Sequence, residues 1–234
     1  MLDLLALSPP GWGGALLRGA LVTLQIAIAA YLVGIVLGLL GAAAKLSGNL
    51  VLLGLAELYT TLVRAVPELL LIILLFYAGT TALNDVLARL GFAAMRINAF
   101  AAAIAVLGIV QGAYQTEVFR GAIQAIPRGQ IEAARAFGMS PLLRLRRVVI
   151  PSMLPNALPG LANLWLILVK DTALISVVGF TELLYTGKQA AGSTRQYFLF
   201  YCAVGAIYLA MTLGSNVLFR LAERRLRRGI PVAA

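Results

Sequence analysis

Five ionisable side chains lie within segments that are otherwise apolar, and they are the first candidates for chemistry in this sequence. They are Arg64, Glu68, Glu117, Lys170 and Asp171. A charged side chain at the depth of a bilayer costs a few kcal/mol or more, so such residues either pair with one another or line a polar pathway. Lys170 and Asp171 are adjacent and point about 100° apart on a helix, so each needs its own partner.

Two interpretations of these charges remain open. In the structural one, the charges pair and hold the helices in register, with Arg64–Asp171 and Lys170–Glu117 as hypothetical pairs. In the functional one, some of them line a cavity for a zwitterionic solute, which needs donors for its carboxylate and acceptors for its ammonium group. A basic side chain on the solute would favour a carboxylate such as Glu117. Neutral hydrogen bonds are available from Tyr114, Thr172 and Ser176.

Covalent catalysis and metal binding are not expected of this chain. The sequence contains no histidine, which is the commonest general base and metal ligand. No segment reads G-x-x-x-x-G-K-[ST], the loop that cradles nucleotide phosphates. No pair of carboxylates has the spacing of metal ligands. The single Cys202 lies in an apolar run, where the expected role is that of a small packed hydrophobe. We therefore predict a protein that is not an enzyme.

The elements that position these residues are long apolar segments. The 234 residues are 61% hydrophobic and 12% charged, with a mean hydropathy of +0.93, and a soluble core does not absorb so much apolar surface. We predict an all-helical polytopic membrane protein with five transmembrane helices. The expected spans are 19–44, 58–84, 97–116, 148–180 and 196–219. The start shows no basic region followed by a cleavage site, so the first segment is expected to remain a span.

Orientation follows from the basic residues of the short connections. Most of them, including Arg144, Arg146, Arg147 and the run within 220–228, fall on the side of the membrane that holds the C-terminus. We predict the N-terminus outside and the C-terminus in the cytoplasm. The net charge of +10 is then explained by anchoring on anionic lipid, and no nucleic-acid partner is needed.

One polar stretch between the third and fourth expected spans is predicted to be exposed to solvent. Pro127 and Gly129 break the preceding helix, and 131–137 reads as about two helical turns, with Gly138 well placed as a left-handed C-terminal residue. Ala133 and Ala134, together with Glu132, present a flat face that a partner can approach closely, with Glu132 orienting the contact. An ordinary solvated connector helix is the alternative.

Prolines occur in the segments on either side of this stretch, at positions where a helix is expected to begin, end or bend. Ser140 followed by proline predicts a new helix start, and 141–150 is expected to form an amphipathic helix at the membrane surface that ends near Pro151. Pro67 falls early in the second expected span, and Pro151 and Pro155 fall at the entry to the fourth. These three prolines are either hinges that let the spans rock or simple helix-entry geometry.

The polar stretch carries a resemblance to a known family. Residues 132–151 read EAA-x3-G-x9-VVIP, which closely resembles the EAA motif of ABC importer permeases. Further stretches resemble the polar amino-acid branch of that family, namely GALVTL at 19–24, VRAVPEL at 63–69 and LVKDTALIS at 168–176. The resemblance covers roughly residues 17–219 and points to permeases for histidine, lysine, arginine, ornithine or opines.

The resemblance implies roles and partners. Glu132, Ala133, Ala134, Phe137 and Gly138 would form the coupling helix that docks in a groove of a dimeric cytoplasmic ATPase, which would bind the ATP and Mg²⁺. A sibling permease, or a second copy, would complete the pathway, and a periplasmic solute-binding protein would deliver the solute. The chain would sit in a bacterial inner membrane. It would divide into a periplasmic segment 1–16, a type I permease domain 17–219 and a basic cytoplasmic tail 220–234.

Two other classes stay open. A stand-alone secondary transporter or channel would use the intramembrane charges as an ion relay, but it has no need of the polar segment 127–151. A passive structural subunit of a larger membrane complex has no need of the intramembrane charges and the prolines.

Overall fold

The chain is helical throughout the part that the computed structural model describes, residues 2–93 and 98–226, and no β-strand occurs there. The α-helices are α1 (Gly13–Leu46), α2 (Leu50–Ala65), α3 (Glu68–Arg89), α4 (Ala99–Gln124), α5 (Arg128–Ala136), α6 (Pro141–Arg144), α7 (Ile150–Asp171), α8 (Leu183–Thr194) and α9 (Tyr197–Leu226). Short 3-10 turns cover Leu2–Leu5 and Thr172–Val178, and a π-helical segment, Leu145–Val149, joins α6 to α7.

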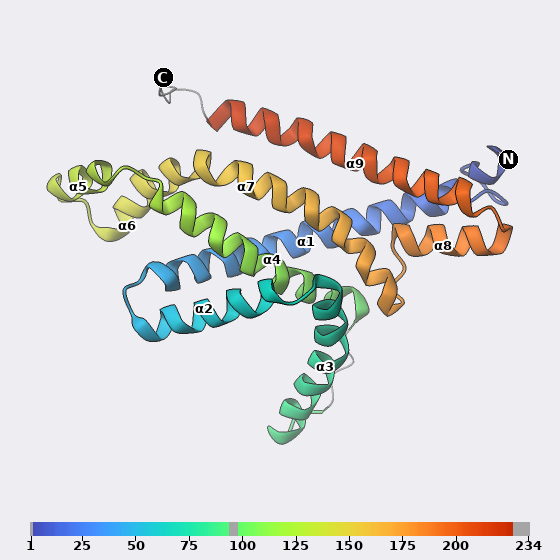
Figure 1. Cartoon of the computed structure of the whole chain (residues 1–234), viewed down its shortest axis with the longest axis horizontal. Coiled ribbons are helices and arrows are strands. Elements are labelled where there is room, and N and C mark those ends of the chain that lie inside the picture. The colour runs from blue at the N-terminus through green and yellow to red at the C-terminus, as the bar shows by residue number, and fades with distance from the viewer. Residues whose placement is uncertain (1, 94–97, 227–234) are drawn as a thin grey trace.

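Five stretches in these described ranges are long and apolar enough to cross a membrane. They are Gly13–Leu46, Glu68–Arg89, Ala99–Gln124, Pro141–Val178 and Tyr197–Leu226. Figure 1 shows α5 and α6 at one end of the elongated bundle, and α8 with the N-terminus at the opposite end. The prediction of an all-helical protein with five long apolar helices is confirmed.

The second expected span, 58–84, is wrong as a continuous helix. Helix α2 begins at Leu50, where the Asn49 side chain accepts hydrogen bonds from the backbone N–H groups of Val51 and Leu52, and it ends at Ala65. Val66 is extended, with φ −97° and ψ 138°, and α3 begins after Pro67. Proline has no N–H and disfavours helical geometry in the residue before it, so the chain breaks here instead of bending. Helix α3 then projects away from the bundle (Figure 1).

Helices α1 and α4 form the centre of the bundle and run parallel to each other. Glycines on α1 make room for α4: an added Cβ at Gly34 would lie 3.0 Å from Gln111 Cβ, and one at Gly38 would lie 2.8 Å from Gln115 Cβ. Gly41 faces Thr116 in the same way. Small residues at a helix contact let the backbones approach closely, which favours association in lipid, where burial from water no longer drives it.

Gly38→Ala should therefore destabilise the protein. The added methyl group meets Gln115 from both its side chain and its backbone, and overpacking of this kind costs roughly 1–3 kcal/mol. The thermal unfolding midpoint in mild detergent should fall, as should the amount of protein in the membrane. Gly205→Ala on α9 is the control, because nothing lies within 4 Å of its added Cβ. An equal midpoint for both variants would contradict the close α1–α4 packing.

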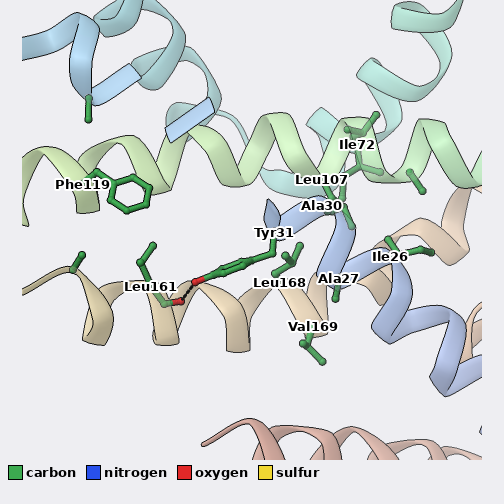
Figure 2. Packing of buried hydrophobic residues seen from close by; sticks show 14 of the residues in the cluster. Ile26, Ala27, Ala30, Tyr31, Ile72, Leu107, Phe119, Leu161, Leu168 and Val169 are labelled. Carbon is green, nitrogen blue, oxygen red and sulfur yellow. Dashed lines mark hydrogen bonds between the residues drawn. The ribbon is translucent and has the colours of Figure 1, made fainter. Parts of the chain in front are cut away.

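Helix α7 packs against α1 and α4 in the antiparallel direction. The Tyr31 hydroxyl of α1 donates a hydrogen bond to the backbone carbonyl of Leu161 at 2.8 Å, as Figure 2 shows. Its ring meets Trp165 edge to face at 5.3 Å between centroids, and the Trp165 indole N–H donates to Ser215 on α9 at 2.9 Å. This chain of contacts ties three of the long helices together around the buried Tyr31 and the half-buried Trp165.

The expected end of a surface helix near Pro151 is also wrong. Ser140 does begin α6, accepting a hydrogen bond from the N–H of Leu143, but the helix continues through the π-helical segment into α7. Pro151 lies in the first turn of α7, and Pro155 is buried within it. The wide π turn, in which the N–H of Ile150 donates to Leu145 O, relieves the clash that a proline makes with the preceding turn.

Candidate functional site

Helix α5 is the exposed segment that carries the EAA motif. It begins after Pro127 and ends at Ala136. Phe137 follows as the C-cap residue, Gly138 adopts a left-handed φ of 72°, and the N–H of Met139 donates to Ala134 O at 3.1 Å. The glycine at the C-terminal end is confirmed, but the helix begins at Arg128, three residues before the predicted start, and includes Gly129. The Ser152 hydroxyl donates to the Gln130 side chain at 3.1 Å, which fixes α5 to the first turn of α7.

The two alanines of the motif face different ways. Ala134 is buried against this chain, whereas Glu132 and Ala133 are exposed, because successive helical residues point about 100° apart. The expected flat face therefore has one alanine, not two. Beside it, the ring of Phe137 is 85% exposed. A protruding aromatic ring next to a small residue is the kind of anchor that fills a pocket on a partner protein.

Four of the charged and polar residues singled out by the sequence come together where α2, α3, α4 and α7 meet. We call Arg64, Glu68, Tyr114 and Asp171 the polar cluster. The Arg64 guanidinium lies 5.8 Å from the centroid of the Tyr114 ring. The Glu68 carboxyl lies close enough to Tyr114 and Asp171 to interact electrostatically with both. Two facing carboxyl groups repel when both are ionised, so a cation between them is stabilised.

The break at Pro67 creates this arrangement. Arg64 lies in the last turn of α2 and Glu68 in the first turn of α3. The turn between these helices places both side chains beside α4. Lys170, Thr172 and Ser176, the other residues expected at this site, lie near Asp171 in the sequence but take no part in the contacts of the cluster described above. Lys170 is exposed, Ser176 is half-buried, and the Thr172 hydroxyl donates to the carbonyl of Val169 at 2.7 Å.

Glu117 belongs to a different group, which we call the ion network. Lys45, whose side chain is 1% exposed, donates to Glu117 Oε1, to Thr60 at 2.7 Å and to Glu57 at 3.1 Å. Arg120 donates to the other carboxylate oxygen of Glu117 at 2.8 and 2.9 Å. The network thus joins α1, α2 and α4 near the end of the bundle that carries α5.

The hypothetical Lys170–Glu117 pair is wrong. Helix α7 runs antiparallel to α4, and an added Cβ at Gly160 would lie 2.9 Å from Val118. Lys170 lies about 15 Å further along α7, at 1.5 Å per residue. Glu117 instead pairs with Lys45 and Arg120. Arg64 and Asp171, which both lie within the described ranges, do not form an ion pair with each other either.

A second buried carboxyl group, which the sequence analysis missed, is that of Glu182. It caps α8 by accepting hydrogen bonds from the N–H groups of Leu184 and Tyr185, each at 2.8 Å, and it also accepts from Tyr208 and Thr23. Burial raises the pKa of Glu182 above its usual range. The four hydrogen bonds lower this pKa, but burial has the larger effect. Its position directly before an apolar helix start was the available signal.

Two buried glutamines of α4 were also missed. Gln111 donates to the carbonyl of Leu164 at 3.4 Å, and the Gln115 amide finds no protein partner in the part of the chain that is described. Both face α1 at Gly34. Amide side chains inside the expected span 97–116 were the available signal, because uncharged polar groups in lipid face other helices.

Comparison with known proteins agrees with this arrangement. Residues 17–228 match the family described as "Binding-protein-dependent transport system inner membrane component". The chain is 46% identical over 233 residues to the nopaline transport system permease protein NocQ of Agrobacterium fabrum, covering 98% of each chain. It is 43% identical over 220 residues to the histidine/lysine/arginine/ornithine transport system permease protein HisQ of Escherichia coli, covering 94% of this chain and 96% of that one.

Solved structures show the same fold. A chain from the crystal structure of an amino acid ABC transporter with histidines superposes with a TM-score of 0.77 at 34% identity, covering 92% of this chain and 95% of that one. An inward-facing form of the MetNI methionine ABC transporter gives a TM-score of 0.74 at 22% identity, which shows the fold alone. The chain therefore belongs to the family of binding-protein-dependent transport system inner membrane components, the permeases of ABC importers.

Proposed function

We propose that this chain moves a basic amino acid or an opine from the periplasm to the cytoplasm by alternating access, as one half of the pathway of an ATP-driven importer. A cytoplasmic ATPase dimer, a sibling permease or second copy, and a periplasmic solute-binding protein complete the assembly. The chain binds neither ATP nor Mg²⁺ in this proposal. It sits in the bacterial inner membrane with its N-terminus in the periplasm and its C-terminus in the cytoplasm.

The observation that carries the proposal is the exposed face of α5. Glu132, Ala133 and Phe137 point away from the chain, while Ala134 and the contact between Ser152 and Gln130 hold the helix against α7. When an ATPase dimer bound to this face closes, it moves α5, and α7 moves together with α5. Pro67, at the α2–α3 break, and Pro151 and Pro155, at the start of α7, are the proposed hinges of that motion.

The assembly is tested by affinity purification of the tagged chain from its native membrane in mild detergent. Co-purification of an ATPase and a second permease supports a heterodimeric pathway, and an ATPase alone supports two copies of this chain. The outcome that rejects the proposal is a chain that purifies alone and transports solute in proteoliposomes without ATP. That outcome assigns the intramembrane charges to an ion-driven transporter instead.

The polar cluster supports the choice of solute. Glu68 and Asp171 together suit an ammonium or guanidinium group, Arg64 suits a carboxylate, and Tyr114 adds a neutral donor. Lys170, Thr172 and Ser176 stand next to the cluster in sequence and complete the proposed pathway. Glu117 serves the ion network instead, because both of its oxygens are engaged.

Asp171→Asn and Glu68→Gln should each lower ATP-driven uptake of radiolabelled arginine about ten-fold or more. Removing a carboxylate that pairs with the charged group of a bound solute costs about 2–5 kcal/mol. A ten-fold loss of uptake corresponds to about 1.4 kcal/mol, so the expected loss is ten-fold or more. Asp85→Asn is the control, since Asp85 is an exposed acid near the other end of α3. Wild-type affinity and rate in both cluster variants would refute the assignment of the solute site, and leave the importer assembly standing.

A further inference from the structure

A groove with a basic and aromatic lining runs between α1 and α8 at the end of the bundle opposite α5. One cavity of about 530 Å³ is lined by Trp12, Tyr185, Lys188, Gln189, Gly192 and Ser193. A second, of about 230 Å³, has Trp12 and Gln189 in its lining as well, together with Arg18 and Thr186. The two cavities adjoin each other at Trp12 and Gln189, and together we call them the α1–α8 groove.

Close packing fixes the walls of the groove. An added Cβ at Gly19 would lie 3.0 Å from Leu183 Cα, so the backbones of α1 and α8 approach each other closely at that point. On α8, Leu183, Thr186, Gly187, Ala190 and Ala191 are buried against its neighbours. The opposite stripe, at positions 185, 188, 189 and 192, follows the i, i+3, i+4, i+7 pattern of one helix face and lines the groove.

The lining has the chemistry of an anion site. Arg18 of α1 lines the smaller cavity and Lys188 of α8 lines the larger one, so each cavity has one cationic residue. The Gln189 amide lines both cavities and supplies an N–H donor, whereas the hydroxyl groups of Thr186 and Ser193 already donate to the backbone carbonyls of Glu182 and Ala190. Neither cavity has an aspartate or glutamate among its described lining residues, and the buried Glu182 is engaged by Thr23, Tyr208 and its own helix.

The surroundings select a lipid as the source of the anion. Trp12 and Tyr185 carry an apolar ring with a polar edge, the type of side chain that collects at the headgroup level of a bilayer. Leu17 and Leu21 are 51% and 59% exposed and flank Arg18 on the surface of α1. Ile28 and Leu32 continue this apolar stripe along the same helix, where acyl chains can lie while the phosphate stays at Arg18.

We propose that the α1–α8 groove binds the phosphate headgroup of an anionic phospholipid, with Arg18 and Lys188 as its cationic contacts and the Leu17–Leu21 stripe of α1 along its acyl chains. This site lies apart from the polar cluster, the ion network and the exposed face of α5. It gives the end of the bundle opposite α5 a preferred lipid neighbour that is independent of the transported solute.

The test uses the full chain with its co-purifying partners in nanodiscs of phosphatidylglycerol and phosphatidylcholine, followed by native mass spectrometry of the retained lipids. The wild type should retain phosphatidylglycerol in preference to phosphatidylcholine. Arg18→Gln combined with Lys188→Gln should lower that preference about five-fold for each removed charge. Lys188→Arg should keep it, and Arg89→Gln, which removes an exposed charge at the end of α3, is the matched control.

Three results would overturn the proposal. One is equal retention of phosphatidylglycerol by the double variant and the wild type. Another is equal retention of both lipids by the wild type, which indicates apolar contact without headgroup recognition. The third is displacement of phosphatidylglycerol by soluble glycerol 3-phosphate at the same concentration, which indicates a site for free anions. Uptake by the double variant is measured in parallel, so that failure of this inference is distinguished from failure of the importer assignment.

Discussion

Glu132→Lys is expected to abolish ATP-driven uptake while the protein still inserts and folds. Glu132 is exposed on α5 and makes no contact that holds the helix in place, whereas Ala134 and Gln130 do so. Charge reversal at a docking face juxtaposes like charges or removes a pair, and like-charge contacts at an interface cost several kcal/mol. A loss of about 2–4 kcal/mol of binding corresponds to roughly 30-fold to 1,000-fold weaker coupling to the ATPase.

The measurement is uptake in proteoliposomes together with the amount of ATPase that co-purifies. Asp85→Lys, an equal change of charge on an exposed acid of α3, should leave both quantities unchanged. Phe137→Ala tests the same face by removing the exposed ring, and should weaken co-purification without lowering the thermal unfolding midpoint. Normal uptake by Glu132→Lys would remove the docking role from α5.

Glu117→Leu is expected to be the most destabilising substitution in the ion network. It leaves the buried ammonium of Lys45 with only Thr60 and the half-exposed Glu57 as partners. Removing one member of a buried pair costs roughly 3–5 kcal/mol, because the remaining charge stays buried without full compensation. Lys45→Met should cost less, because Glu117 keeps both hydrogen bonds from Arg120.

The double variant Lys45→Met/Glu117→Leu separates a pairing effect from simple damage to the bundle. It removes the buried charge of Lys45 together with its partly buried partner Glu117, and replacing both members of such a pair is often close to neutral, so the double variant should be more stable than Glu117→Leu alone. Thermal unfolding midpoints in mild detergent provide the comparison. If the two destabilisations simply add, Lys45 and Glu117 do not interact in the folded protein, and the network does not couple α1 to α4.

The amino-acid sequence by itself determined the class of the protein and the local form of its helices. Long apolar segments predicted five membrane-crossing helices, because a bilayer requires about 20 apolar residues in each. Gly138 marked the end of α5 to within two residues, because a glycine after a helix acts within one turn, whereas the start was predicted three residues too late, since Gly129 lies inside the helix. Such signals depend only on near neighbours in the chain.

Only the tertiary structure decided which charges meet. Lys45 and Glu117 are brought together by the parallel packing of α1 on α4, which rests on glycines that look like any other small residues in an apolar run. The antiparallel course of α7 separates Lys170 from Glu117. Pro67 broke the second span where the sequence equally allowed a kink, because prolines inside transmembrane helices are tolerated when neighbouring helices satisfy the freed backbone groups. Pairing between distant segments depends on helix direction and contact, and neither is written in the local pattern of residues.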